Sequence, residues 1–319
     1  MRWRDVPDAR DGGRLESRER TRRFFRARRL MNMSAASHLV PQPDLPAHAR
    51  SGPLVVLRSQ SEQVRAVAWF IGLSLGLVAL AAGTTLAAPD SEIVAAYVPF
   101  VLALGPAVVA VCLAWREGHG SMRRLWRSLG RRPANARWYL VLLLPVLWAF
   151  AVVGVAIGLG EPTAGLFDDL LPGAVIVSLV VLLPAFAEEL AWRGFATPRL
   201  MAAMSPLRVS LVLAIPWIAL HLVLHLPGAM NDSAAVWPTV LSVFAYSVLL
   251  TWIFVSTGGS VLLAALVHAG LNGVVPIMSG LDAEAAWAIR AVLAAVIAIA
   301  VVGLGGFRRV VALSGHTTR

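Results

Sequence analysis

The chain has no lysine and a single cysteine, and charged residues make up only 14% of its 319 residues. One cysteine, Cys112, excludes an internal disulfide and any metal or iron–sulfur site built from several cysteines. Hydrophobic residues make up 58% of the chain, and a soluble domain of this size could not cover so much apolar surface with so few charges. The composition therefore predicts a polytopic membrane protein.

All 28 basic residues are arginines, and with 18 acidic residues they give a net charge of +10. Most of them lie in the first 62 residues and in loops between apolar runs, which is typical of membrane orientation rather than nucleic-acid binding. Residues 1–62 lack a long apolar run, so we expect a disordered cytoplasmic tail whose arginines, like those of the loops, attract anionic lipids. Alternatively, translation begins at Met31 or Met33.

Residues 63–309 are predicted to form the transmembrane domain, and residues 310–319 a short C-terminal tail. The apolar runs within residues 63–309 have about 20 residues each, the length that crosses a hydrocarbon core. Eight runs can be distinguished: 66–87, 94–115, 138–160, 172–192, 209–227, 236–256, 260–277 and 287–307. The predicted fold is an all-α membrane bundle of about eight transmembrane helices.

The charges of the connecting loops predict the orientation of this bundle. Seven arginines lie in loop 116–137, three follow the fourth run, and Arg308 and Arg309 directly follow the last run. The alternate loops carry acidic residues and no arginine, apart from Arg290 at the edge of the last run. Because positive loops stay inside, we expect both termini in the cytoplasm, with the protein in the inner membrane of a bacterium.

Three polar clusters interrupt the apolar runs of the second half, where a charged side chain costs on the order of 2.5–3.5 kcal/mol at the bilayer centre. The first is Glu188-Glu189-Leu190-Ala191-Trp192-Arg193. The second is Trp217-Ile218-Ala219-Leu220-His221, with His225 one turn further on. The third is His268-Ala269-Gly270-Leu271-Asn272.

Helical spacing separates the two glutamates of the first cluster. Glu189 and Arg193 are four residues apart and can form an ion pair along one face. Glu188 is rotated by about 100° and shares a face with Trp192, so it has no local counter-charge. A carboxylate left unpaired in a low-dielectric environment accepts a proton readily, which suits a general base.

The other two clusters place imidazoles and an amide on single helix faces. His221 and His225 share a face with Trp217, whose indole is expected to pack rather than to take part in chemistry, as is that of Trp192. His268 shares a face with Asn272. If these faces converge with Glu188, the cavity holds the groups needed to activate water and to stabilise an oxyanion.

Taken together, the three motifs resemble those of the CPBP family of intramembrane endopeptidases, which includes type II CAAX prenyl proteases, abortive-infection proteins and bacteriocin-processing proteins. They are Glu-Glu-x-x-x-Arg, aromatic-x-x-x-His and His-x-x-x-Asn, in this order. The similarity covers roughly residues 100–276, with the motif-bearing core at about 170–276. Trp217 departs from the usual Phe or Tyr of the family.

The resemblance implies an intramembrane peptidase with a catalytic cavity open to the cytoplasmic side. Glu188 and His221 would activate the attacking water, and His268 and Asn272 would stabilise the oxyanion. Glu189 and Arg193 would support these residues. The implied substrate is a membrane-embedded or lipid-anchored protein or peptide.

Two other readings of the same residues stay open. A zinc ion could be bound by His221, His268 and Glu188, with His225 as a further ligand, although a metal-free, glutamate-dependent protease is favoured. A non-catalytic immunity or scaffold protein, or less favourably a proton-coupled transporter, could also contain these buried polar groups.

The predicted boundaries conflict with a shared site. They place Glu188 near the inner edge of the fourth run and His221 nearer the outer edge of the fifth. Residues that act together must lie within a few ångströms, so either the boundaries are displaced or Pro184 and Pro216 distort their helices.

Overall fold

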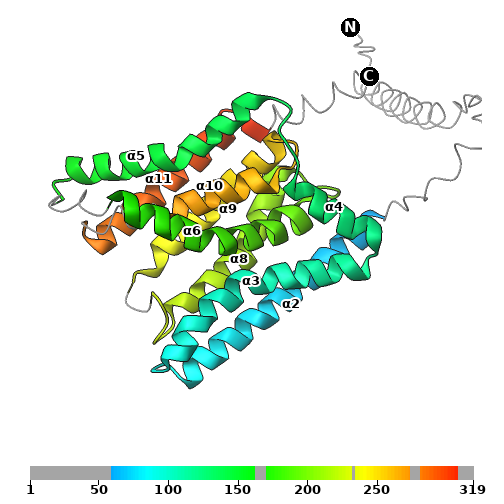
Figure 1. Ribbon diagram of the computed structural model, residues 1–319, viewed down its shortest axis with the longest axis horizontal. Helices are drawn as coiled ribbons and strands as arrows, with labels where there is room; N and C mark the ends of the chain where they lie inside the picture. Colours follow the sequence, from blue (N-terminus) through cyan, green and yellow to red (C-terminus); the bar gives the residue numbers. More distant parts are fainter. Residues whose placement is uncertain (1–58, 162–169, 232–233, 274–280, 308–319) are drawn as a thin grey trace, which may run out of the picture. The chain divides into compact units, whose positions relative to one another are not determined.

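The computed structural model describes residues 59–161, 170–231, 234–273 and 281–307, and every regular element in these ranges is a helix (Figure 1). The all-α class is therefore confirmed. The predicted tails, residues 1–62 and 310–319, lie almost entirely outside the described residues and stay predictions.

Helices of the first half are α2 (Gln60–Ala87), α3 (Glu92–Arg116), α4 (His119–Leu129), the 3₁₀ helix η2 (Ala136–Leu143) and α5 (Leu144–Gly158). The second half contains α6 (Leu170–Glu189), the π-helix η3 (Leu190–Ala196), α7 (Thr197–Leu200), α8 (Pro206–Leu222), the 3₁₀ helix η4 (Val223–His225), α9 (Val236–Ser256), α10 (Val261–Gly273) and α11 (Ala283–Gly303).

Among the described residues, six helical segments are long and apolar enough to cross a membrane: α2, α3, η2 with α5, α8 with η4, α9 and α11. The helices α6 and α10 lie at the fourth and seventh predicted runs, but they are not among the six, and α10 has only 13 residues. A polytopic membrane fold is confirmed, while the count of eight spans is not.

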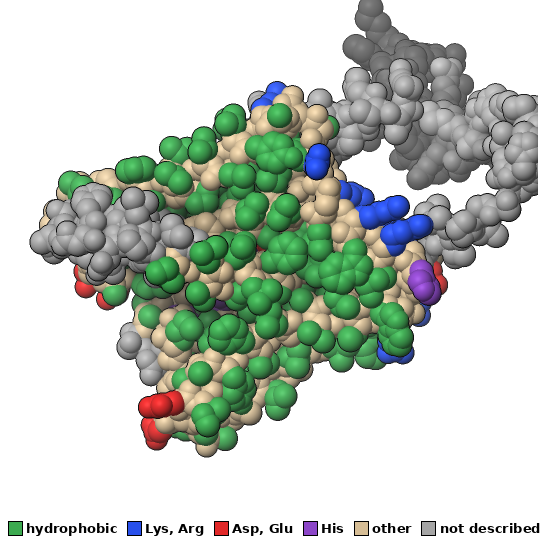
Figure 2. All heavy atoms as spheres, viewed as in Figure 1, with side chains coloured by type: hydrophobic (Ala, Val, Ile, Leu, Met, Phe, Trp, Pro, Cys, Tyr) green, Lys and Arg blue, Asp and Glu red, His purple; other side chains and the backbone are tan. Residues whose placement is uncertain are grey.

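The outer surface of the helices is apolar, as lipid contact requires. Large side chains such as Trp69, Leu80, Leu147 and Ile299 are more than 60% exposed. Figure 2 shows hydrophobic side chains over most of this face, with arginines gathered at the end where α4 lies and groups of acidic side chains at the opposite end. An apolar surface of this extent would be unstable in water and is typical of a protein in a bilayer.

The predicted end of the fourth run at residue 192 is wrong. The chain stays helical from Leu170 to Leu200, through α6, the π-helix η3 and α7. Glu189 is therefore followed by eleven further helical residues, seven in η3 and four in α7. Both glutamates consequently lie well inside the helix rather than at its edge, which removes the conflict between the predicted boundaries.

The fifth predicted run, 209–227, is also displaced. Helix α8 begins three residues earlier, at Pro206, because the Ser205 hydroxyl caps it and proline is well suited to the first helical position. It continues through Pro216 and ends at Leu222. His221 thus belongs to the last turn of α8.

Close packing between helices brings the polar clusters together. α6 packs along α10, α8 along α9, and α9 along α11. At Gly270 of α10 an added Cβ would lie 2.5 Å from the ring of Pro145 in α5, so only glycine permits this approach. At Gly194 of η3 an added Cβ would lie 3.1 Å from Leu125, on the buried face of α4. Gly194, directly after the first polar cluster, and Gly270, within the third, therefore set how closely the neighbouring helices approach these clusters.

Candidate active site

The ion pair predicted within the first motif is present. Arg193 donates from NH1 to Oε1 of Glu189 at 2.8 Å, and both side chains are almost completely buried. Arg193 also donates to the backbone carbonyl of Ser247 in α9 at 3.5 Å. The ion pair expected for residues four positions apart forms even though Arg193 lies in the π-helix η3.

Glu189 joins two motifs, which the sequence did not predict. Nδ1 of His268 in α10 lies 3.0 Å from the same Oε1 atom that accepts from Arg193. Because a carboxylate oxygen only accepts when ionised, Nδ1 carries the proton and Nε2 is the ring atom left for chemistry. The other oxygen of Glu189, Oε2, is buried and has no hydrogen-bond partner among the described residues.

Glu188 is also buried, at 7% exposure, but its partner is an indole. Nε1 of Trp217 in α8 donates to Oε2 of Glu188 at 2.6 Å. The oxygen Oε1 of Glu188 makes no hydrogen bond with another described residue. The prediction that Glu188 lacks a charged partner on its own helix agrees with this arrangement, whereas the prediction that Trp217 only packs is incomplete.

Trp217 lies at the centre of the cluster. Its ring centroid is 5.8 Å from that of His221 and 5.5 Å from that of His268, both nearly edge-on. The guanidinium carbon of Arg193 lies 4.6 Å from its ring centroid, a distance typical of a cation–π contact. One indole therefore contacts residues of all three motifs, so the faces of α6, α8 and α10 converge.

His221 is half-buried, and its Nδ1 lies 2.9 Å from the backbone carbonyl of Trp217. A carbonyl oxygen can only accept, so neutral His221 has its proton on Nδ1 and a lone pair on Nε2. This tautomer makes Nε2 an acceptor for a water proton.

The remaining two candidates are not linked to this cluster by hydrogen bonds between described residues. His225 in η4 has Nδ1 3.2 Å from the Ala234 carbonyl and Nε2 2.9 Å from the Thr239 hydroxyl, so both ring nitrogens are engaged away from the motifs. Asn272 is partly buried and lies one turn beyond His268 on α10.

The residues as placed do not fit a metal ion. No group of three or more His, Cys, Asp or Glu side chains in the described part of the chain could hold one. Of the proposed zinc ligands, His225 has both ring nitrogens engaged by other groups.

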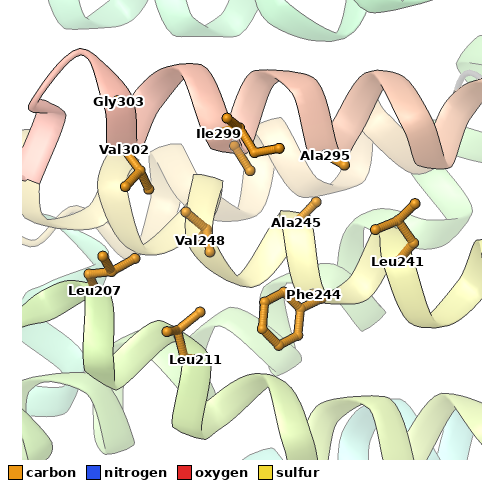
Figure 3. Close-up of a pocket in the computed structure, with 11 residues that line it drawn as sticks. Leu207, Leu211, Leu241, Phe244, Ala245, Val248, Ala295, Ile299, Val302 and Gly303 are labelled. Carbon is orange, nitrogen blue, oxygen red and sulfur yellow. The ribbon is translucent and has the colours of Figure 1, made fainter.

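A separate cavity of about 520 Å³ lies between α8, α9 and α11. Figure 3 shows its wall, with Leu211, Phe244 and Ile299 among the lining side chains. The lining contains no charged or polar side chain, so this cavity has no group that could act on a peptide bond.

Two features of the site were not predicted from the sequence. No local pattern indicates the π-helix η3, although all seven of its residues are buried and such turns are frequent at functional sites. The indole donor of Trp217 could have been suspected, since a buried Trp N–H normally has a partner and an unpaired carboxylate was expected nearby.

Comparison with known proteins agrees with the motifs. Residues 170–274 match the family described as type II CAAX prenyl endopeptidase Rce1-like. The match spans all three polar clusters and confirms the family expected from them. No curated protein matches the chain significantly.

The contacts predict different stabilities for two conservative variants. Glu189→Gln removes the charge that Arg193 and His268 share, and breaking a buried ion pair in this way typically costs about 3–5 kcal/mol in the free energy of unfolding. Glu188→Gln keeps a carbonyl oxygen that can accept from Trp217 and should change this free energy by about 1 kcal/mol or less.

Unfolding of both variants and the wild type in the same detergent, followed by tryptophan fluorescence, measures this difference. An equal loss of stability in the two variants would contradict the separate roles of the two glutamates.

Proposed function

The chain carries an Rce1-like domain of the CAAX-type intramembrane endopeptidases, and we propose that it hydrolyses a peptide bond of a membrane-embedded or lipid-anchored substrate at the cluster around Trp217. The observation that carries this proposal is the buried Glu188, whose only hydrogen bond to a described residue comes from a neutral donor. An ion-paired carboxylate such as Glu189 would be a poorer base.

In the proposed reaction Glu188 takes a proton from a water molecule while Nε2 of His221 accepts a hydrogen bond from the same water. The water oxygen attacks the carbonyl carbon, and the negative charge moves to the carbonyl oxygen. The C–N bond then breaks, and the protonated Glu188 returns its proton to the amine that leaves. The base is thereby regenerated.

His268 and Asn272 are proposed to stabilise the negative oxygen of the intermediate. Because Nδ1 of His268 donates to Glu189, the ring can donate from Nε2 only when it is an imidazolium. Arg193 donates to the same oxygen of Glu189 and holds this carboxylate in place. The Asn272 amide lies one turn further along α10 and can supply a second donor.

Catalysis by Glu188 predicts that Glu188→Gln lowers cleavage by about 10²–10⁴-fold, the usual worth of a general base. The measurement compares membrane-protein cleavage products, by quantitative mass spectrometry, between cells with the wild type and cells with the variant. Glu284→Gln, a change at an exposed residue of α11, is the matched control. Wild-type products from Glu188→Gln would make a scaffold or transporter the better explanation.

The reaction is proposed to be independent of metal, because the candidate ligands do not form a metal-binding group. Purified protein dialysed against a chelator should therefore keep its activity on a farnesylated peptide that ends in Cys-Val-Leu-Ser. Loss of activity with recovery on adding Zn²⁺, and a stoichiometric metal content, would establish the alternative mechanism.

Orientation is proposed from the arginine asymmetry: α4 and both termini face the cytoplasm. With Cys112 replaced by Ser, a cysteine at Arg123 of α4 and one at Glu284 of α11 should be labelled from opposite sides of the membrane. Both positions are exposed. Labelling of both from one side would refute the topology.

A further inference from the structure

Small side chains leave the cavity between α8, α9 and α11 open. Ala245 of α9 and Ala295, Ala298 and Gly303 of α11 are among its lining residues, and its volume is about 520 Å³. A Cβ atom added at Gly303 would have no neighbour within 4 Å in the described part of the chain, apart from its own helix backbone. An empty space loses the contacts of the atoms around it, so a ligand that fills the cavity stabilises the protein.

The lining of the cavity defines the chemistry of the ligand. Every lining residue is Leu, Phe, Ile, Val, Ala or Gly, so no side chain could pair with a polar group. A peptide segment would bring N–H and C=O groups that find no partner there, whereas a hydrocarbon chain has none to satisfy. The lining residues Leu211, Phe244 and Ile299 are also exposed on the outer surface, so the cavity is open to the surrounding lipid.

The length and position of the cavity suit a chain from one leaflet. Figure 3 shows Leu207, Val302 and Gly303 near one end and Leu241 and Ala295 near the other. Ala295 and Gly303 are eight residues apart, about 12 Å along the axis of α11. This distance is less than half of the hydrocarbon core, which is about 30 Å thick. Helix α11 ends at Gly303, so a headgroup would lie at that end of the cavity.

A cation lies at the same end. Arg208 is exposed and directly follows Leu207 in the first turn of α8. It is three residues from Leu211, so the two side chains are neighbours on the helix surface. None of the ion pairs between described residues includes Arg208. An arginine near the end of a membrane-spanning helix extends its guanidinium to the level of the lipid headgroups.

We propose that this cavity binds an acyl chain of an anionic phospholipid and that Arg208 binds the phosphate group of the same lipid. The apolar wall holds the chain, and the arginine selects the headgroup. An anionic lipid fits better than a zwitterionic one, because the positive group of a zwitterionic headgroup opposes the attraction of its phosphate to Arg208.

The lipid site is distinct from the proposed active site. Trp217 follows Leu211 by six residues, about 9 Å along α8, and it points about 120° away around the helix. The cavity lies between α8, α9 and α11, whereas the cluster around Trp217 joins α6, α8 and α10. Lipid binding therefore does not depend on hydrolysis, and either proposal can fail without the other.

Native mass spectrometry of the purified full chain in detergent tests the site, with dioleoyl phosphatidylglycerol and dioleoyl phosphatidylcholine as the two probes. Their acyl chains are identical and only the headgroup differs. The wild type should bind phosphatidylglycerol about fivefold tighter, the effect of one arginine near an anionic headgroup. Arg208→Gln should bind both lipids with the affinity for phosphatidylcholine. Arg123→Gln, at an exposed arginine of α4, is the matched control and should keep the preference.

Two variants that fill the cavity test the acyl-chain site separately. Ala295→Phe and Gly303→Leu should each weaken binding of both lipids by about tenfold or more, since loss of two buried methylene groups already has this effect. The two substitutions lie at opposite ends of the cavity, so if one variant fails to fold, the other still decides.

Three results would overturn the proposal. The first is equal binding of the two lipids by the wild type, and the second is wild-type lipid binding by a folded Ala295→Phe or Gly303→Leu. The third is a different occupant. Displacement of the lipid by a farnesylated peptide would assign the cavity to a substrate's prenyl chain, and a dimer that Ala295→Phe abolishes would assign it to a second copy of the chain.

Discussion

One oxygen atom holds the polar interior of this membrane protein together. Oε1 of Glu189 accepts from the guanidinium of Arg193 and from the imidazole of His268, so a single carboxylate links η3 to α10. In an apolar interior a carboxylate is tolerated only when its charge is compensated. Loss of one member of the ion pair leaves an uncompensated buried charge, which destabilises the folded protein. The constraint explains why two cationic or protonatable groups converge on a residue that is itself fully buried.

The division of roles between the two glutamates follows from this constraint. Since Glu189 carries the ion pair, Glu188 is left with the indole of Trp217 as its partner. Trp217 fills the space between His221, His268 and Arg193, so the same side chain that orients Glu188 also keeps the histidines apart. A Phe at this position would fill the space without donating a hydrogen bond, whereas Trp adds a fixed donor to one carboxylate oxygen.

Contacts within one helix could be predicted from the sequence, and contacts between helices could not. The Glu189–Arg193 pair follows from a spacing of four residues. The hydrogen bonds of His268 to Glu189 and of Trp217 to Glu188 depend on how α6, α8 and α10 pack. No local sequence pattern indicates this packing. The predicted fourth apolar run ends at residue 192, directly before the charged Arg193. In the structure the chain stays helical through Arg193, which is paired with Glu189, and on to Leu200.

We propose that Glu189 and Arg193 act as one buried unit that supports the site. A double-mutant cycle with Glu189→Gln, Arg193→Met and the double variant tests it most directly, through the free energy of unfolding in detergent. We expect that each single variant is strongly destabilised and that the double variant recovers about 1–3 kcal/mol relative to the sum of the two. Destabilisations that add within about 0.5 kcal/mol would contradict it.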